Sequence, residues 1–216
     1  MQRLAALAAA VVVLAGCSKP AAKPAEAAGV PQASADLPLL PIGGDFELTD
    51  QNGQPFTLAS QRGTVLLVFF GYTMCPDACP TTLSKLSTAY SRLSPEDRTR
   101  VKAIYITIDP ERDTPAVMKA YLAYFGVDAF GLSGTPEQVA GVAHLFKAQY
   151  ERSDAKTAGG YLMSHTVSVF GLDAQGKART TIDYDASVDA VVNEIRGLLN
   201  AKPVTDLRQP GKLPSM

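Results

Sequence analysis

The sequence of 216 residues has no tryptophan, 3 cysteines and 2 histidines, and it has no surplus of either charge. Its 20 Lys and Arg residues against 21 Asp and Glu residues give a formal net charge of −1. Proteins that bind nucleic acid neutralise phosphates with clustered basic residues, so this balance argues against DNA or RNA as a partner. Because thiols and imidazoles are so few, any thiol or metal chemistry must depend on a handful of side chains.

Long apolar runs are also scarce. The N-terminal run from Leu4 to Leu14 falls short of the roughly 20 residues that a membrane-spanning helix needs. It follows Arg3 and ends in small residues before Cys17, which is the order of segments in a secretory signal. We therefore predict a signal peptide over residues 1–16.

The ending Leu-Ala-Gly-Cys resembles the bacterial lipobox, which implies cleavage before Cys17 and lipid attachment to its thiol. Several acyl chains on one residue are enough for stable membrane anchoring. We expect an exported, membrane-anchored lipoprotein that faces the periplasm or the cell exterior, where conditions are oxidising. An ordinary cleaved signal with an incidental cysteine is the alternative.

Composition divides the mature chain into three parts. Residues 17–41 are rich in Ala and Pro without a periodic apolar pattern, which predicts a lipidated tether. Residues 201–216 hold three prolines and few apolar residues, which predicts a C-terminal tail. Residues 42–200 between them are long enough for a single domain with one hydrophobic core.

The domain alternates strand and helix patterns. Apolar or β-rich runs predict strands at 46–48, 56–58, 64–70, 101–108, 166–170 and 178–182. Periodic apolar residues and Thr-Pro starts predict helices at 80–93, 114–125, from 135 onward, and 187–199. Turn signals at 50–53 and 173–176 predict hairpins. This order predicts an α/β, thioredoxin-like sandwich with a mixed central sheet flanked by helices and an N-terminal hairpin.

Two thiols, Cys75 and Cys79, directly follow the buried strand 64–70 and lie at the start of a helix. Ligands gather at the carboxyl ends of strands in such sheets, and a helix N-terminus favours the thiolate. The spacing C-x-x-x-C puts the sulfurs one helical turn apart, with Cβ atoms about 5–6 Å apart in a regular helix. A disulfide needs about 3.5–4.5 Å. The pair therefore favours metal chelation or redox exchange over a structural disulfide.

A third ligand to a metal on these thiols would be a histidine. His144 lies about 140° from the apolar stripe of its predicted helix, which indicates an exposed surface residue. His165 precedes the strand 166–170; such a histidine alone is more typical of a hydrogen-bonded structural residue, but with the cysteines it becomes the candidate ligand. Met74 and Met163 carry soft thioethers, but methionine more often fills cores, and we interpret both in that way.

Three motifs in order, GYTMCPDACP at 71–80, TIDPERDTP at 107–115 and YLMSHT at 161–166, resemble the Sco/SenC family over about residues 40 to 200. The resemblance implies a thioredoxin-like copper metallochaperone that delivers copper to the dinuclear centre of cytochrome c oxidase subunit II. Other periplasmic copper or thiol carriers are the further partners that we expect.

The resemblance also implies the site residues. Cys75, Cys79 and His165 bind one copper ion, as Cu(I) or Cu(II), and Asp109 helps to handle copper or to dock a partner. The family often has Asp where this chain has Ser164. We interpret Glu111 and Asp113, in the same stretch as Asp109, as exposed loop residues with local ion pairs of little energetic weight.

Three other functions are alternatives to a copper carrier. A thiol-disulfide oxidoreductase that reduces the acceptor's cysteines before metallation is the main alternative, although its usual motif has two residues between the cysteines. A peroxidase is disfavoured because Tyr72 and Pro76, three residues before the two cysteines, are not the threonine of that pattern. A structural zinc site needs four ligands, and three are evident.

Overall fold

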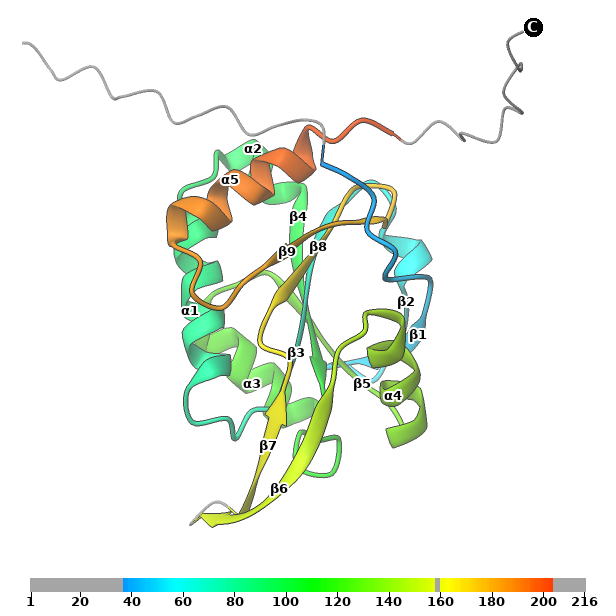
Figure 1. The fold of residues 1–216 in the computed structure, drawn as a ribbon, viewed down its shortest axis with the longest axis vertical. Coiled ribbons are helices and arrows are strands. Elements are labelled where there is room, and N and C mark those ends of the chain that lie inside the picture. The colour runs from blue at the N-terminus through cyan, green and yellow to red at the C-terminus, as the bar shows by residue number, and fades with distance from the viewer. Residues whose placement is uncertain (1–36, 158–159, 204–216) are drawn as a thin grey trace, which may run out of the picture. The chain divides into compact units, whose positions relative to one another are not determined.

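The computed structural model describes residues 37–157 and 160–203 (Figure 1). One sheet contains seven strands: β1 (Glu47–Asp50), β2 (Pro55–Thr57), β3 (Val65–Gly71), β4 (Val101–Thr107), β5 (Ala129–Ser133), β8 (Val169–Leu172) and β9 (Ala178–Ile182). Their order across the sheet is β2-β1-β5-β4-β3-β8-β9. The helices are η1 (Leu58–Gln61), α1 (Ala78–Ser91), α2 (Pro95–Thr99), α3 (Pro115–Phe125), α4 (Pro136–Leu145) and α5 (Val188–Leu199).

The central strand β3 explains why the sheet is mixed. Its sequence VLLVFFG is buried at every position, as expected for a strand that is covered on both faces. β3 pairs in parallel with β4 and in antiparallel orientation with β8. The N-terminal hairpin of β1 and β2 joins the same sheet through β5. The predicted mixed sheet and N-terminal hairpin are therefore confirmed.

Helices cover both faces of the sheet. Figure 1 shows α1, α3 and α5 on one side of the strands and α4 on the other. Helices α3 and α4 each begin with a threonine whose side chain accepts a hydrogen bond from the first turn, followed by proline. α3 ends at Gly126, whose φ of 63° is the left-handed conformation that glycine adopts readily.

A second, two-stranded sheet was not predicted. β6 (Tyr150–Thr157) and β7 (Gly160–His165) pair in antiparallel orientation and extend away from the main sheet (Figure 1). We call these two strands the hairpin arm. The strand predicted at 166–170 begins at Val169, so His165 does not stand at its entrance but ends the arm.

The predicted signal peptide, Cys17, most of the predicted tether and residues 204–216 of the predicted C-terminal tail lie outside the described residues. At the described end of the tether, Leu40 donates a backbone hydrogen bond to Ala178, and the carbonyl of Leu37 accepts one from Arg179. Within the described ranges, no helix has the length and apolar character required to cross a bilayer.

Candidate metal centre

The two thiols lie where β3 passes into α1. Cys75 belongs to the connecting turn, in which its N–H donates to the carbonyl of Tyr72 at 3.1 Å. α1 begins at Ala78, so Cys79 lies in its first turn and Cys75 precedes the helix. Both sulfurs nevertheless lie within 4.8 Å of each other, about one helical turn, as the spacing predicts. The Cys79 N–H points at the Cys75 sulfur at 3.4 Å.

Burial distinguishes the two cysteines. Cys79 has no exposed surface, whereas Cys75 is half-buried, and both are free thiols. The Cys79 sulfur sits against the backbone of Gly71, where a Cβ atom would lie only 2.7 Å from it. A glycine at the end of β3 therefore makes room for this sulfur.

His165 brings its imidazole to the sulfurs from the end of β7. Its Nε2 lies 3.6 Å from the Cys79 sulfur and 4.0 Å from the Cys75 sulfur. Its Nδ1 lies 2.9 Å from the carbonyl of Thr166, to which it donates, so Nε2 is the ring nitrogen that faces the sulfurs. The rings of Phe69 and Tyr72 pack edge-on against the imidazole.

The ligand atoms of Cys75, Cys79 and His165 all lie within 4.8 Å of one another. Two thiolates and one imidazole form a soft donor set, which suits copper and zinc and is unlike the all-oxygen sites of magnesium or calcium. The three residues come from segments about 90 positions apart, so the fold itself assembles the group. The donor set has the chemistry that copper requires.

The pKa values of the two thiols are shifted in opposite directions. A hydrogen bond from the Cys79 thiol lowers the pKa of Cys75 to about 3, with a further contribution from His165 and against the opposing effect of burial. The hydrogen bond to Cys75, burial and the charge of Cys75 together raise the pKa of Cys79. The first proton therefore leaves easily, and a bound cation would have to displace the second.

Asp113 holds the turn that carries Cys75. Its side chain has no exposed surface, and its carboxylate accepts hydrogen bonds from the N–H and hydroxyl of Thr73 and from the hydroxyl of Thr107. The expectation of an exposed loop residue is wrong for Asp113, because three donors from two other segments surround it. Glu111 is exposed as expected.

Asp109 is also buried, with 3% of its surface exposed. Its carboxylate accepts from Arg112 Nε at 2.5 Å and from the Tyr161 hydroxyl at 2.6 Å. Its role in copper handling or docking stays a prediction. Sequence reasoning missed Arg112 and Tyr161 as neighbours of the site, although both stand within the motifs that carry the family resemblance.

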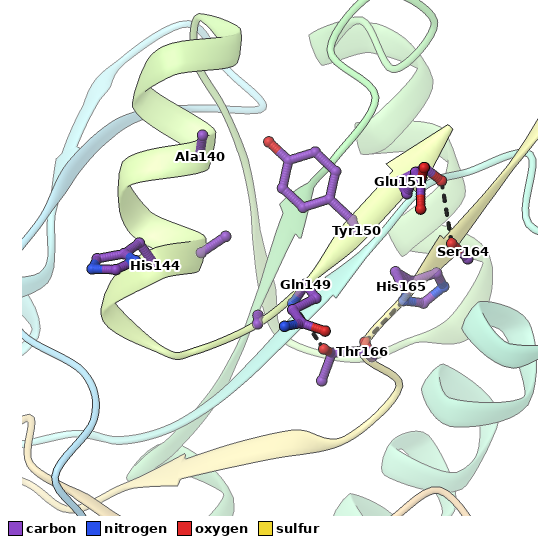
Figure 2. Close-up of a pocket in the computed structure, with 10 residues that line it drawn as sticks. Ala140, His144, Gln149, Tyr150, Glu151, Ser164, His165 and Thr166 are labelled. Atoms are coloured by element: carbon purple, nitrogen blue, oxygen red, sulfur yellow. Dashed lines mark hydrogen bonds between the residues drawn. The ribbon is translucent and has the colours of Figure 1, made fainter. Parts of the chain in front are cut away.

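A groove of about 880 Å³ opens beside His165, between α4 and the hairpin arm (Figure 2). His144 lies on α4, exposed and outside the group of ligands, as predicted. Met163 is half-buried against the core. Met74 is 48% exposed, so its interpretation as core filler is wrong: the turn before α1 directs it outward.

Comparisons with known proteins agree on one family. A model of the SCO1/SenC family matches residues 35–200. The SCO2-like protein of Rickettsia felis is 38% identical over 157 residues, which cover 72% of this chain and 76% of the relative. A protein of Stutzerimonas stutzeri described as a putative copper-binding protein is 34% identical, over 72% of this chain and 76% of the relative.

Among solved structures, Bradyrhizobium japonicum ScoI with copper bound superposes with a TM-score of 0.66 at 39% identity. The match covers 73% of this chain and 99% of that protein. This likeness confirms the predicted α/β, thioredoxin-like fold. The match to the family model spans most of the chain, including all three candidate ligand residues, and the chain therefore belongs to the SCO1/SenC family.

Proposed function

We propose that the protein is a copper metallochaperone that binds one copper ion through Cys75, Cys79 and His165. It passes the ion to the dinuclear copper centre of cytochrome c oxidase subunit II. The observation that carries the proposal is the convergence of two free thiols and an imidazole nitrogen within 4.8 Å, from separate segments of the chain. The donor set, and the family to which the chain belongs, support copper as the cargo.

The ligands differ in how an acceptor can reach them. Two thiolates are sufficient for Cu(I), and the imidazole of His165 completes a site for Cu(II). Cys79 is buried, whereas Cys75 and His165 are partly exposed. An incoming acceptor ligand therefore meets copper on the side of Cys75 and His165, and transfer proceeds by exchange of one ligand at a time.

The proposed location completes this function. A lipid on Cys17 and a tether over residues 17–41 would keep the domain over residues 42–200 near a membrane oxidase, on the periplasmic or outer face. Other periplasmic copper or thiol carriers would load it, and nucleic acid plays no part. The printed sequence supports this through its charged, apolar and small-residue N-terminal segments.

Thiol-disulfide exchange with the acceptor is the second candidate, favoured by the half-buried Cys75 next to the buried Cys79. In this reaction the Cys75 thiolate attacks an acceptor disulfide, which releases one acceptor thiolate and leaves a mixed disulfide. Cys79 then attacks Cys75 and releases the second acceptor thiolate, so that this pair is oxidised and the acceptor pair reduced. Two electrons and two protons pass to the acceptor.

Copper titration of the full chain tests the main proposal. A Cys17→Ser background removes the third thiol, so that only Cys75 and Cys79 remain. We expect one copper per chain with and without reductant, and a thiolate charge-transfer absorption in the Cu(II) form. His165→Ala should lose affinity for Cu(II) and alter this absorption, whereas the matched control His144→Ala should change neither. Full Cu(II) affinity in Cys75→Ala or His165→Ala would refute the three-ligand site.

A trapping experiment separates the second candidate. Cys79→Ser lacks the resolving thiol, so a reductase should accumulate mixed disulfides through Cys75 with a dicysteine peptide in its oxidised form. Rapid reduction of that peptide by the copper-free protein would favour thiol exchange as the main activity. Stoichiometric copper binding with slow exchange would favour the carrier.

A further inference from the structure

The three candidate ligands belong to two separately built parts of the protein. Cys75 and Cys79 are attached to β3 and α1, at the end of the main sheet. His165 ends β7, which pairs with β6 in a sheet of its own. The distance between His165 and the sulfurs therefore depends on what holds the hairpin arm against the body.

Tyr161 is the main contact at the far end of β7. Its ring lies 3.7 Å from the guanidinium carbon of Arg112 and 3.6 Å from that of Arg152. Two guanidinium groups cannot share one ring face at these distances, so they stack on opposite faces. Arg152 comes from β6 and Arg112 from the loop after β4, and the ring is thus held between the arm and the body.

Hydrogen bonds cross the same junction. The Tyr161 hydroxyl donates to Asp109 Oδ1 at 2.6 Å, and Arg112 Nη1 donates to the Tyr161 carbonyl at 2.9 Å. Arg112 Nε bonds to Asp109 Oδ2 at 2.5 Å, so a single guanidinium joins the arm to a buried carboxylate of the body. A buried carboxylate is costly unless its oxygens are paired, and here the arm supplies a partner for one of them.

The geometry of β7 links this junction to His165. Side chains two positions apart on a strand share a face, which places Tyr161, Met163 and His165 on the same face of β7. Between the two ends, the Met163 N–H donates to the Tyr72 hydroxyl at 3.2 Å. Tyr72 stands three residues before Cys75 and packs against the imidazole, so the strand is fixed at three points along its length.

We propose that Arg112 and Tyr161 are positioning residues for His165: with Asp109 and Arg152 they form a latch that holds the hairpin arm over the two cysteines. Loosening the latch moves the imidazole away and leaves a two-thiolate site. The latch thus sets the share of molecules that offer three ligands. This inference rests on the proposed copper-carrier function, since it assigns a task to His165 within it.

The test compares the two oxidation states of copper in the Cys17→Ser full chain. Tyr161→Phe removes the hydroxyl bond and keeps the ring, Tyr161→Ala removes both, and Arg112→Lys keeps the charge and loses the planar fork. Loss of one hydrogen bond to a charged group should raise the open-to-closed ratio of the arm about tenfold in Tyr161→Phe, and Cu(II) affinity should fall by up to about tenfold. In Tyr161→Ala the Cu(II) absorption and electron paramagnetic resonance spectra should approach those of His165→Ala. Cu(I) affinity should stay close to wild type, and Tyr124→Phe, at an 85% exposed position, serves as the control.

Two results of the copper titrations would overturn the latch. One is a wild-type Cu(II) spectrum and affinity in both Tyr161→Ala and Arg112→Lys. The other is an equal loss of Cu(I) and Cu(II) affinity in Tyr161→Phe, since that would show support for the whole site and not for His165. Tyr161→Phe keeps the ring that packs at the junction, so it remains informative if Tyr161→Ala fails to fold.

A readout without copper separates this inference from the proposed function. In the copper-free protein, Tyr161→Phe should speed hydrogen exchange of the Met163 N–H about tenfold, because opening of the arm breaks its bond to Tyr72. If wild type binds no copper, the carrier function fails, and this exchange rate still decides whether the latch exists. An unchanged rate in Tyr161→Phe would exclude it.

Discussion

Replacing Asp113 by alanine measures how strongly the turn before α1 is held in place. In the structure this carboxylate has no exposed surface and accepts hydrogen bonds from three donors: the Thr73 N–H and hydroxyl, and the Thr107 hydroxyl. Each buried donor left without a partner costs about 1–3 kcal/mol. Thr73 is half-buried, so water can replace part of the hydrogen bonding that it loses. We therefore expect Asp113→Ala to lower the free energy of unfolding by about 3 kcal/mol.

The measurement is urea unfolding of the reduced, copper-free protein, with linear extrapolation to water. Glu111→Gln, two residues away and exposed, is the matched control and should stay within about 0.5 kcal/mol of wild type. The m value should not change, since the variant exposes the same surface on unfolding. A loss below about 1 kcal/mol in Asp113→Ala would refute the assignment of these hydrogen bonds as a main support of the turn.

The pH dependence of Asp113→Asn provides a second check. Burial raises the pKa of Asp113 above the usual 3.8; hydrogen bonds from Thr73 and Thr107 oppose this, and the charge of Asp109 adds to it. The folded state thus binds this proton more tightly than the unfolded chain, so stability falls as pH rises from 3.8 through the raised value. Asparagine does not ionise, so the variant does not lose this stability as pH rises. The stability of the variant relative to wild type should therefore improve as pH increases, and the opposite trend would show that the fold favours the ionised carboxylate.

Two further substitutions test other parts of the fold by the same unfolding assay. Gly71→Ala places a Cβ 2.7 Å from the Cys79 sulfur, so we expect a loss of about 1–3 kcal/mol and weaker Cu(I) binding; wild-type values for both would contradict the close approach. Arg179→Ala leaves the carboxylate of Asp173, 3% exposed and 2.6 Å from the guanidinium, buried without its charge partner, which should cost about 3–5 kcal/mol; a loss near zero would show that Asp173 finds another partner.

The parts of the fold that the sequence could predict are those with local causes. The uninterrupted apolar run of β3 and the Thr-Pro starts of α3 and α4 lie within one residue of their predicted positions. The apolar run indicates a strand buried on both faces, and the Thr-Pro pairs indicate helix N-termini whose N–H groups are capped. Both features depend on residues that are neighbours in the sequence. The two cysteines were found for the same reason, since their position after β3 is visible in the chain itself.

The hairpin arm could not be predicted because its cause is not local. Tyr150–Thr157 reads YERSDAKT, with neither an apolar alternation nor a continuous apolar run. The contacts that fix the arm join Tyr161 to Asp109 and Arg112, about 50 residues earlier in the chain. For the same reason the sequence could not indicate that Asp113 is buried, with its carboxylate hydrogen-bonded to Thr73, 40 residues away.

The division of the site between body and arm bears directly on how a carrier can both hold and release copper. Cys79 is enclosed by the core next to Gly71, so its sulfur cannot move without disturbing the end of β3. His165 is attached to a strand that contacts the body near the site through hydrogen bonds, ring contacts and the half-buried Met163, and no side chain of this strand is fully buried. With the proposed ligands, the imidazole is therefore the one that would leave at the lowest free-energy cost, and the buried thiol is the one that would keep the ion until an acceptor has bound it. A site built from one rigid segment would offer no such order of release.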